Sequence, residues 1–206
     1  MRITLTGRTS HAAAPQDGIS PAPAIARLLA ELPALGPGGD LNEDLALATV
    51  THASMGEPAF GISPGAGEVW VTLRTVTDVR MAELIAAAEM LAQQAATDVG
   101  LRISIAFDDV FEACSNHPEA AAVLNAACEA AGCPAELRQQ PQRWSEDFGQ
   151  FGKQAKAAMF WLGSGTVQPQ LHNPDYDFPD AAIPVGLSVF RETVNALLGS
   201  TAARNR

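Results

Sequence analysis

The chain has 206 residues, of which 47% are apolar and 17% charged, so it can bury a sizeable core and is not a charge-driven disordered chain. Its 13 Lys and Arg against 23 Asp and Glu give a net charge of -10 without a cationic cluster, which argues against a nucleic-acid partner. The longest apolar stretches, such as residues 157–163, are far shorter than the roughly 20 residues that a bilayer requires, and the N-terminus lacks the apolar core of a secretion signal. We therefore expect a soluble, cytoplasmic protein without a membrane partner.

The first half of the sequence predicts one sheet covered by two helices. Residues 3–6 alternate as in a strand with one buried face, and Ile25, Leu28 and Leu32 recur at helical spacing. The expected elements are strand 3–6, helix 21–35, strands 45–53 and 68–76, helix 79–98 and strand 101–105. The order βαββαβ is that of a ferredoxin-like sandwich with a four-stranded antiparallel sheet.

The second half, after about Asp109, predicts a different architecture. Its expected elements are a helix from 117 or 118 to 131, a strand at 135–138, a turn or helix start at 145–148, a strand at 157–162 and a helix at 183–198. The apolar run at 157–162 is typical of a strand buried on both faces. So few strands make a small sheet, and we expect this half to be part of a larger open α/β layer. The predicted domains are therefore residues 1–109 and 110–206.

The three cysteines, Cys114, Cys128 and Cys133, are odd in number and form no C-x-x-C pair. A disulfide framework is therefore not expected, and we interpret them as reduced, small apolar residues. No basic residue stands next to any of them to lower the thiol pKa, which argues against a reactive thiol.

His11 is a candidate functional residue because it lies in a loop of small residues just past a strand. Small neighbours allow a loop to approach a ligand closely, and loops after strands often carry function. From the residues alone, however, a solvated loop histidine is the favoured interpretation. The histidines His52, within a strand, and His117, before a helix, are interpreted as structural.

His172 is a second candidate because its proline-braced loop, residues 171–180, also holds three carboxylates. An imidazole beside carboxylates suits a divalent cation, since one group ligates the ion and another orients the ring. The alternative is that these aspartates only form turns, and that Asp180 caps the helix that follows. Glu146 and Asp147 are adjacent carboxylates at a predicted helix start, where a capping role competes with a functional one.

Four ordered motifs resemble the aminoacylase, carboxypeptidase and hippurate-hydrolase family of dinuclear metal amidohydrolases, with the closest resemblance to the N-acyl-amino-acid amidohydrolase branch. The resemblance spans nearly the whole chain. The matching segments are Gly7-x-x-x-His11-Ala12-x-x-Pro15, Val71-Thr72-Leu73-Arg74-Thr75, Ser145-Glu146-Asp147-Phe148 and Leu171-His172-Asn173-Pro174-x-Tyr176-x-Phe178-x-Asp180.

The resemblance implies a role for each half of the chain. Residues 1–109 would be the ferredoxin-like lid, which also mediates dimerisation, and residues 110–206 would be the C-terminal part of the α/β metallopeptidase catalytic domain. It further implies residue roles: His11 stabilises the oxyanion in the partner subunit's site, His172 ligates metal, Glu146 and Asp147 lie in or beside the metal shell, and Arg74 binds the substrate carboxylate.

The departures from the family concern the metal site and one substrate contact. Family members carry most metal ligands, and the general base, ahead of the lid, and we expect this chain to lack that part because nothing precedes Met1. The family's Asn-Val-Ile-Pro stretch appears here as Gly61-Ile62-Ser63-Pro64, without the amide side chain.

The resulting hypothesis is a metal-dependent hydrolase of C–N amide bonds that acts on N-acyl amino acids or dipeptide-like substrates. A water activated by zinc, manganese or cobalt would attack the amide in the complete homodimeric enzyme. The isolated chain is expected to be inactive. The alternative hypothesis is a non-catalytic dimerisation or binding remnant of a truncated or split amidohydrolase.

Overall fold

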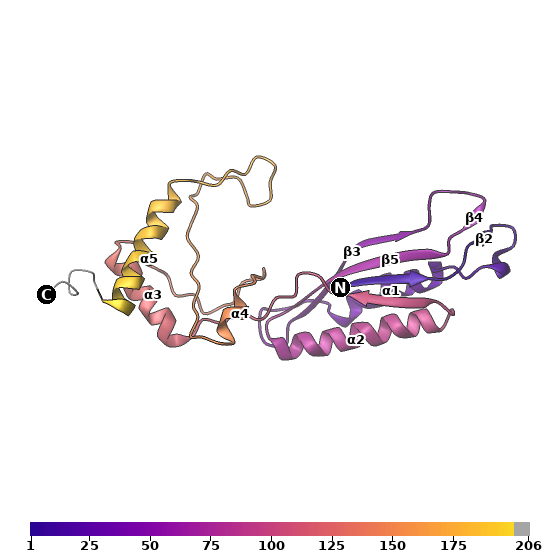
Figure 1. Ribbon diagram of the computed structural model, residues 1–206, viewed down its shortest axis with the longest axis horizontal. Helices are drawn as coiled ribbons and strands as arrows, with labels where there is room; N and C mark the ends of the chain where they lie inside the picture. The colour runs from indigo at the N-terminus through magenta and orange to yellow at the C-terminus, as the bar shows by residue number, and fades with distance from the viewer. Residues whose placement is uncertain (200–206) are drawn as a thin grey trace. The chain divides into compact units, whose positions relative to one another are not determined.

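The computed structural model describes residues 1–199, which form two compact units (Figure 1). The first unit contains Met1–Ala113 and Gln140–Ser145. The second unit contains Cys114–Gln139 and the described residues from Glu146 onward. The chain therefore leaves the first unit after Ala113, returns to it for six residues, and leaves it again after Ser145.

Four antiparallel strands form the main sheet of the first unit, in the spatial order β3-β5-β1-β6. They are β1 (Arg2–Thr6), β3 (Ala46–Met55), β5 (Ala66–Thr75) and β6 (Arg102–Ala106). Two helices, α1 (Ala22–Leu35) and α2 (Asp78–Thr97), pack together against the sheet (Figure 1). This arrangement confirms the predicted ferredoxin-like sandwich.

The alternation of apolar residues along the strands determines which face of the sheet is buried. Ile3 and Leu5 in β1 are fully buried, whereas Thr4 between them is exposed. In β5, Val69 is fully buried and its neighbour Trp70 is 41% exposed. Burying each such aliphatic side chain contributes about 1.5–3 kcal/mol, so the face under the helices provides most of the stability of this unit.

The two helices contribute different kinds of side chain to this core. Helix α1 buries Leu28 and Leu32 completely, at the helical spacing that predicted it. Helix α2 buries mainly alanines, including Ala88 and Ala92, which allow its backbone to lie close to the sheet. Thr77 caps α2: the backbone N–H of Arg80 donates to its hydroxyl oxygen.

The second unit contains three helices: α3 (Pro118–Ala130), α4 (Gly149–Gly152) and α5 (Ala182–Leu198). Helices α3 and α5 pack against each other through a small core of Ala127, Cys128 and Val189, with Phe160 at its edge. His117 caps α3 by accepting a hydrogen bond at Nδ1 from the Glu119 backbone N–H (3.3 Å), so its structural interpretation is confirmed. The buried Cys128 also behaves as predicted, as a reduced apolar residue.

Two predicted strands of the second unit are wrong. Residues 135–138 and 157–162 form no strand, because the described part of this unit offers no neighbouring strand with which they could pair. The second segment is nevertheless held in place: the Met159 backbone N–H donates to Asn116 Oδ1, and Asn116 Nδ2 donates to the Met159 carbonyl, both at 2.8 Å. The apolar run therefore has the pattern of a buried strand but lacks the sheet.

The predicted N-cap at Asp180 is also wrong. Ala181 is the N-cap residue of α5, and no side chain caps the helix. Asp180 contributes only its backbone carbonyl, which accepts from the Ile183 backbone N–H at 3.0 Å. None of the helices within residues 1–199 is long and apolar enough to cross a membrane.

Candidate functional site

The loop that carries His11 is held by a small second sheet in the first unit. Strand β2 (Ser10–His11) pairs antiparallel with β4 (Ile62–Ser63), so that His11 lies opposite Ile62. The backbone N–H of Ala12 extends this pairing by donating to the Gly61 carbonyl at 3.0 Å. The divergent segment 61–64 is therefore the direct neighbour of His11, which sequence reasoning did not predict because the two pieces are some 50 residues apart.

Three glycines allow the chain to pack tightly at the base of this loop. A Cβ atom on Gly7 would lie 2.1 Å from the Ile19 carbonyl oxygen, and one on Gly65 would lie 2.4 Å from the Thr9 nitrogen. A Cβ on Gly18 would lie 2.6 Å from Ser10 Oγ. The Gly7 backbone N–H also donates to the Gly65 carbonyl at 2.7 Å. These contacts explain the glycine that opens the His11 motif: any side chain there would displace the loop.

The imidazole of His11 is exposed and has a defined hydrogen-bonding direction. Its Nδ1 atom accepts a hydrogen bond from the Ala13 backbone N–H at 3.0 Å. An accepting Nδ1 carries no proton, so the proton of the neutral ring lies on Nε2. Within the described residues Nε2 has no hydrogen-bond partner, and it can donate to a group that approaches from outside the loop.

A hollow of about 610 Å³ lies beside the base of the His11 loop. Arg8 and Glu57 contribute opposite charges to its lining, and Ile62 and Pro64 contribute apolar surface. His11 itself does not line the hollow. The exposed His11 ring therefore projects from a tightly packed base of glycines beside this hollow.

Arg74 lies near the end of β5, at the edge of the first unit where the chain returns from the second. Its Nη1 donates to Ser145 Oγ at 3.0 Å and to the Arg143 carbonyl at 3.4 Å. The guanidinium predicted to bind a substrate carboxylate is thus in contact with the segment that precedes Glu146 and Asp147.

The predicted metal-site residues of the second unit do not gather into one cluster. His172 is exposed and adopts a left-handed backbone conformation (φ 73°) inside the turn that is closed by the hydrogen bond from the Asn173 backbone N–H to the Gln170 carbonyl. Asp147 is exposed and Glu146 is half-buried. Within residues 1–199, no three His, Cys, Asp or Glu side chains come together in a way that could hold a metal ion.

Glu146 does affect one nearby group. Partial loss of hydration at the sulfur and, second, the negative charge of Glu146 raise the pKa of the Cys114 thiol. Burial and then the neighbouring Cys133 raise the pKa of the Cys128 thiol. Both shifts favour the neutral thiol, so neither cysteine is activated as a nucleophile or a metal ligand.

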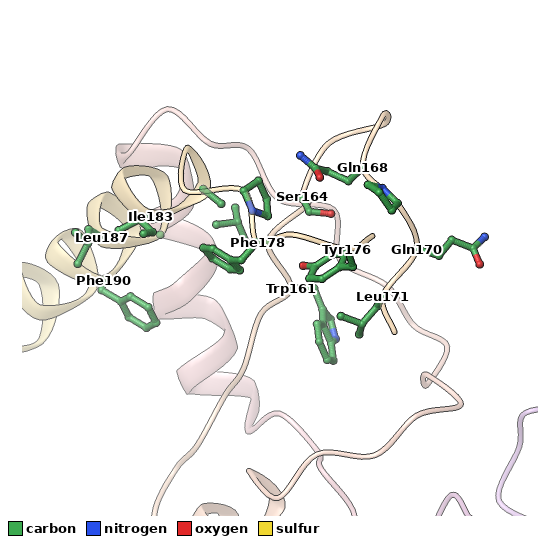
Figure 2. Close-up of a pocket in the computed structure, with 15 residues that line it drawn as sticks. Trp161, Ser164, Gln168, Gln170, Leu171, Tyr176, Phe178, Ile183, Leu187 and Phe190 are labelled. Carbon is green, nitrogen blue, oxygen red and sulfur yellow. The ribbon is translucent and has the colours of Figure 1, made fainter. Parts of the chain in front are cut away.

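Sequence reasoning missed an apolar cavity of about 650 Å³ in the second unit. Figure 2 shows Trp161, Leu171 and Tyr176 on one side of it and residues of α5 on the other. The α5 side chains are Ile183, Leu187 and Phe190, all exposed and spaced four and three residues apart. Helix α5 already buries Val189 against α3, so these three residues form a second apolar stripe on it. That stripe could have predicted the cavity from the sequence. The cavity borders the His172 loop through Leu171 and Tyr176.

The sequence profile of the peptidase family M20/M25/M40 matches residues 16–196. The chain is also similar in structure to the Bacillus subtilis protein YXEP, described as a dinuclear metal binding peptidase of the M20 family. The two are 17% identical with a TM-score of 0.67, over 96% of this chain and 49% of that one.

Two further solved structures show the same fold. Aminopeptidase PepT from Bacillus cereus is 16% identical with a TM-score of 0.66, over 94% of this chain and 51% of that one. The aminobenzoyl-glutamate utilization protein from Klebsiella pneumoniae is 18% identical with a TM-score of 0.62, over 71% of this chain and 37% of that one. The chain thus spans between 37% and 51% of the length of these three proteins.

Proposed function

Since the chain belongs to the peptidase family M20/M25/M40, we propose that the complete protein hydrolyses the amide bond of N-acyl amino acids or similar small amides. Residues 1–109 act as its lid, and residues 110–206 act as the C-terminal part of its catalytic domain. Two relatives support an amide substrate by their descriptions: one is an aminopeptidase, and another is named for aminobenzoyl-glutamate, an N-acyl amino acid.

The observation that carries this proposal is the fixed orientation of His11. Its Nδ1 is occupied by the Ala13 backbone N–H, so the ring presents an Nε2–H donor from a rigid loop. Attack on an amide carbonyl creates a negatively charged oxygen, and a donor already aimed at that oxygen accelerates the reaction by about a hundredfold to a thousandfold. His11 is the residue that we assign to this role.

The distance between His11 and Arg74 indicates that these two side chains of one copy do not act in the same active site. Ile62, which pairs with His11, precedes the start of β5, whereas Arg74 lies at its other end. Ten residues of extended strand at about 3.3 Å per residue separate the two ends by about 30 Å. An active site that uses both side chains must therefore draw them from two copies of the chain. This supports the proposal of a homodimer formed through the lid.

The described residues do not form a complete metal site. The relative from Bacillus subtilis is described as binding two metals, and each metal usually needs three or four protein ligands. This chain offers His172 as one ligand and Glu146 and Asp147 as candidates for the surrounding shell, and these do not cluster. We propose that the remaining ligands and the general base come from the part of the relatives' length to which this chain does not align. We therefore expect the 206-residue chain alone to have no amidase activity.

Hydrolysis of hippurate and other N-acyl amino acids tests this proposal. The 206-residue chain is assayed with added zinc, manganese or cobalt and with a chelated control, beside a complete protein that carries the chain within its full length. Metal-dependent turnover by the complete protein only is the expected result. Turnover by neither protein would instead favour the alternative function, a non-catalytic dimerisation or binding module, for which the absence of a metal cluster within residues 1–199 is the supporting observation.

A further inference from the structure

The junction between β5 and α2 in the first unit is a short, internally fixed turn. The Thr75 hydroxyl donates to the Thr77 carbonyl at 2.9 Å, and the Thr77 hydroxyl accepts from the Arg80 backbone N–H at 3.2 Å. Two side chains, those of Arg74 and Asp78, project from the two ends of this turn and contact segments far away in the sequence. The rigid turn makes this junction a suitable place to hold other parts of the chain.

Both segments that connect the two units are bonded to this junction. On the outgoing segment, the Ala113 backbone N–H donates to Asp78 Oδ1 at 2.7 Å. On the returning segment, Arg74 Nη1 donates to Ser145 Oγ at 3.0 Å and to the Arg143 carbonyl at 3.4 Å.

A third contact strengthens the hold on the returning segment. Arg143 Nη2 donates to the Gly39 carbonyl at 3.2 Å, in the loop before β3. Residues 140–145 form neither helix nor strand, so these side-chain bonds account for their position within the first unit. Hydrogen bonds to charged groups are stronger than neutral ones, which suits side chains that hold an irregular segment.

We propose that Arg74 and Asp78 are positioning residues that anchor both connecting segments to the first unit, so that bending between the units is confined to residues after Ala113 and after Ser145. The two residues are four positions apart on one turn and hold segments that are about 30 residues apart from each other. Glu146 and Asp147 directly follow the anchored Ser145, so Arg74 also restrains the polypeptide at the start of the predicted metal-shell carboxylates. The Arg74 guanidinium therefore has structural partners within its own chain, Ser145 and Arg143, in addition to the substrate contact that the motif implies.

Hydrogen–deuterium exchange on the full 206-residue chain tests the anchor. We expect Arg74→Met to raise exchange in residues 140–147 about three- to tenfold, because the segment loses its bonds to the guanidinium. We expect Asp78→Ala to raise exchange at Ala113 by a similar factor, and Asp78→Asn, which keeps an Oδ1 acceptor, to restore most of the protection. Trypsin cleavage after Arg143 should accelerate in Arg74→Met.

Arg80→Met is the matched control, because Arg80 lies on the same turn but its side chain pairs with Glu83 on α2. It should leave both segments as protected as in the unaltered chain. Unchanged exchange in both segments of Arg74→Met and Asp78→Ala would overturn the proposal. So would an equal rise in the core strands β1 and β5, which would show general destabilisation, or an equal rise in the control. Because no readout is enzymatic, these outcomes are independent of the proposed activity.

Discussion

His11 and Arg74 lie at opposite ends of β5, about 30 Å apart along one strand. The short strands β2 and β4, which hold His11, lie beyond the first residue of β5 (Figure 1). Arg74, the next-to-last residue of β5, contacts Ser145 of the returning segment. A single copy of the first unit thus carries its two candidate functional residues, His11 and Arg74, at opposite ends of β5. The two side chains of one copy are therefore too far apart to act on the same small substrate.

The glycine that opens the His11 motif is predicted to be essential for the loop. Gly7→Ala should lower the free energy of unfolding by about 1–3 kcal/mol, because the new methyl group would lie 2.1 Å from the Ile19 carbonyl oxygen and force the backbone to move. Gly61→Ala is the control in the neighbouring β4 segment, since its Cβ would meet no atom within 4 Å. Urea denaturation of both variants measures the difference. Equal stability of the two would contradict the close packing described here.

Two consecutive leucines of α1 should respond differently to truncation. Leu28 is fully buried under the sheet and Leu29 is 42% exposed. Leu28→Ala should cost about 2–5 kcal/mol through lost burial and the cavity that remains, whereas Leu29→Ala should cost less than about 1 kcal/mol. Thermal and urea unfolding provide both values. A larger loss for Leu29→Ala would mean that α1 is rotated relative to the structure or that its outer face is covered in solution.

The Cys114 thiol is predicted to react with alkylating reagents only at higher pH than an ordinary thiol. Its pKa is raised by partial loss of hydration at the sulfur and then by the charge of Glu146, and the thiolate is the reacting form. Glu146→Gln removes the charge and should shift the rate profile of Cys114 toward lower pH. The profile of Cys128 should not move, because its raised pKa has other causes. Mass spectrometry of labelled peptides distinguishes the two sites.

The raised pKa values of the Cys114 and Cys128 thiols also predict how the stability of the fold changes with pH. A thiol whose pKa is higher in the folded state than in the unfolded state favours folding while it stays protonated. The contribution is fully present below the ordinary thiol pKa of about 8.5 and is lost as the pH rises through the folded pKa. Urea midpoints measured from pH 7 to pH 10 should therefore fall, and replacement of Cys128 by Ser should make the fall smaller. A midpoint that rises over this range would contradict the shifts.

The isolated chain should not bind a metal ion in stoichiometric amount. His172 is exposed and Glu146 and Asp147 do not join it in a cluster, so a single imidazole cannot retain zinc through desalting. Elemental analysis after incubation with zinc, manganese or cobalt is expected to find far less than one ion per chain. One retained ion per chain that disappears in His172→Ala would show that the chain forms a metal site on its own.

The parts of the fold that depend on local sequence were predictable. Alternation around Ile3 and Leu5, helical spacing of Leu28 and Leu32, and the Thr77 cap each specify their element without reference to distant residues. The run at 157–162 misled because an apolar pattern identifies burial and not the presence of a neighbouring strand.

The parts of the site that depend on distant pairing were not predictable. His11 pairs with Ile62 through a strand of only two residues, which no periodicity can reveal. Arg74 meets Ser145 across 71 positions of sequence, through side-chain bonds that no local pattern encodes. The motifs identified which residues to consider, and only the structure showed that Arg74 contacts Ser145 whereas His11 lies beyond the other end of β5.

Subunit mixing in the complete protein tests whether His11 serves the active site of another copy of the chain. His11→Ala and His172→Ala variants, each inactive alone, are unfolded together, refolded as an equimolar mixture and assayed on an N-acyl amino acid. In a mixed dimer, the subunit with an intact His172 receives an intact His11 from its partner, so one of two sites works and the mixture should regain about a quarter of the original activity through random pairing. If His11 instead serves its own chain, every site in the mixture lacks one of the two residues. The mixture would then be no more active than the separate variants, and that result would contradict the role of His11 in another copy.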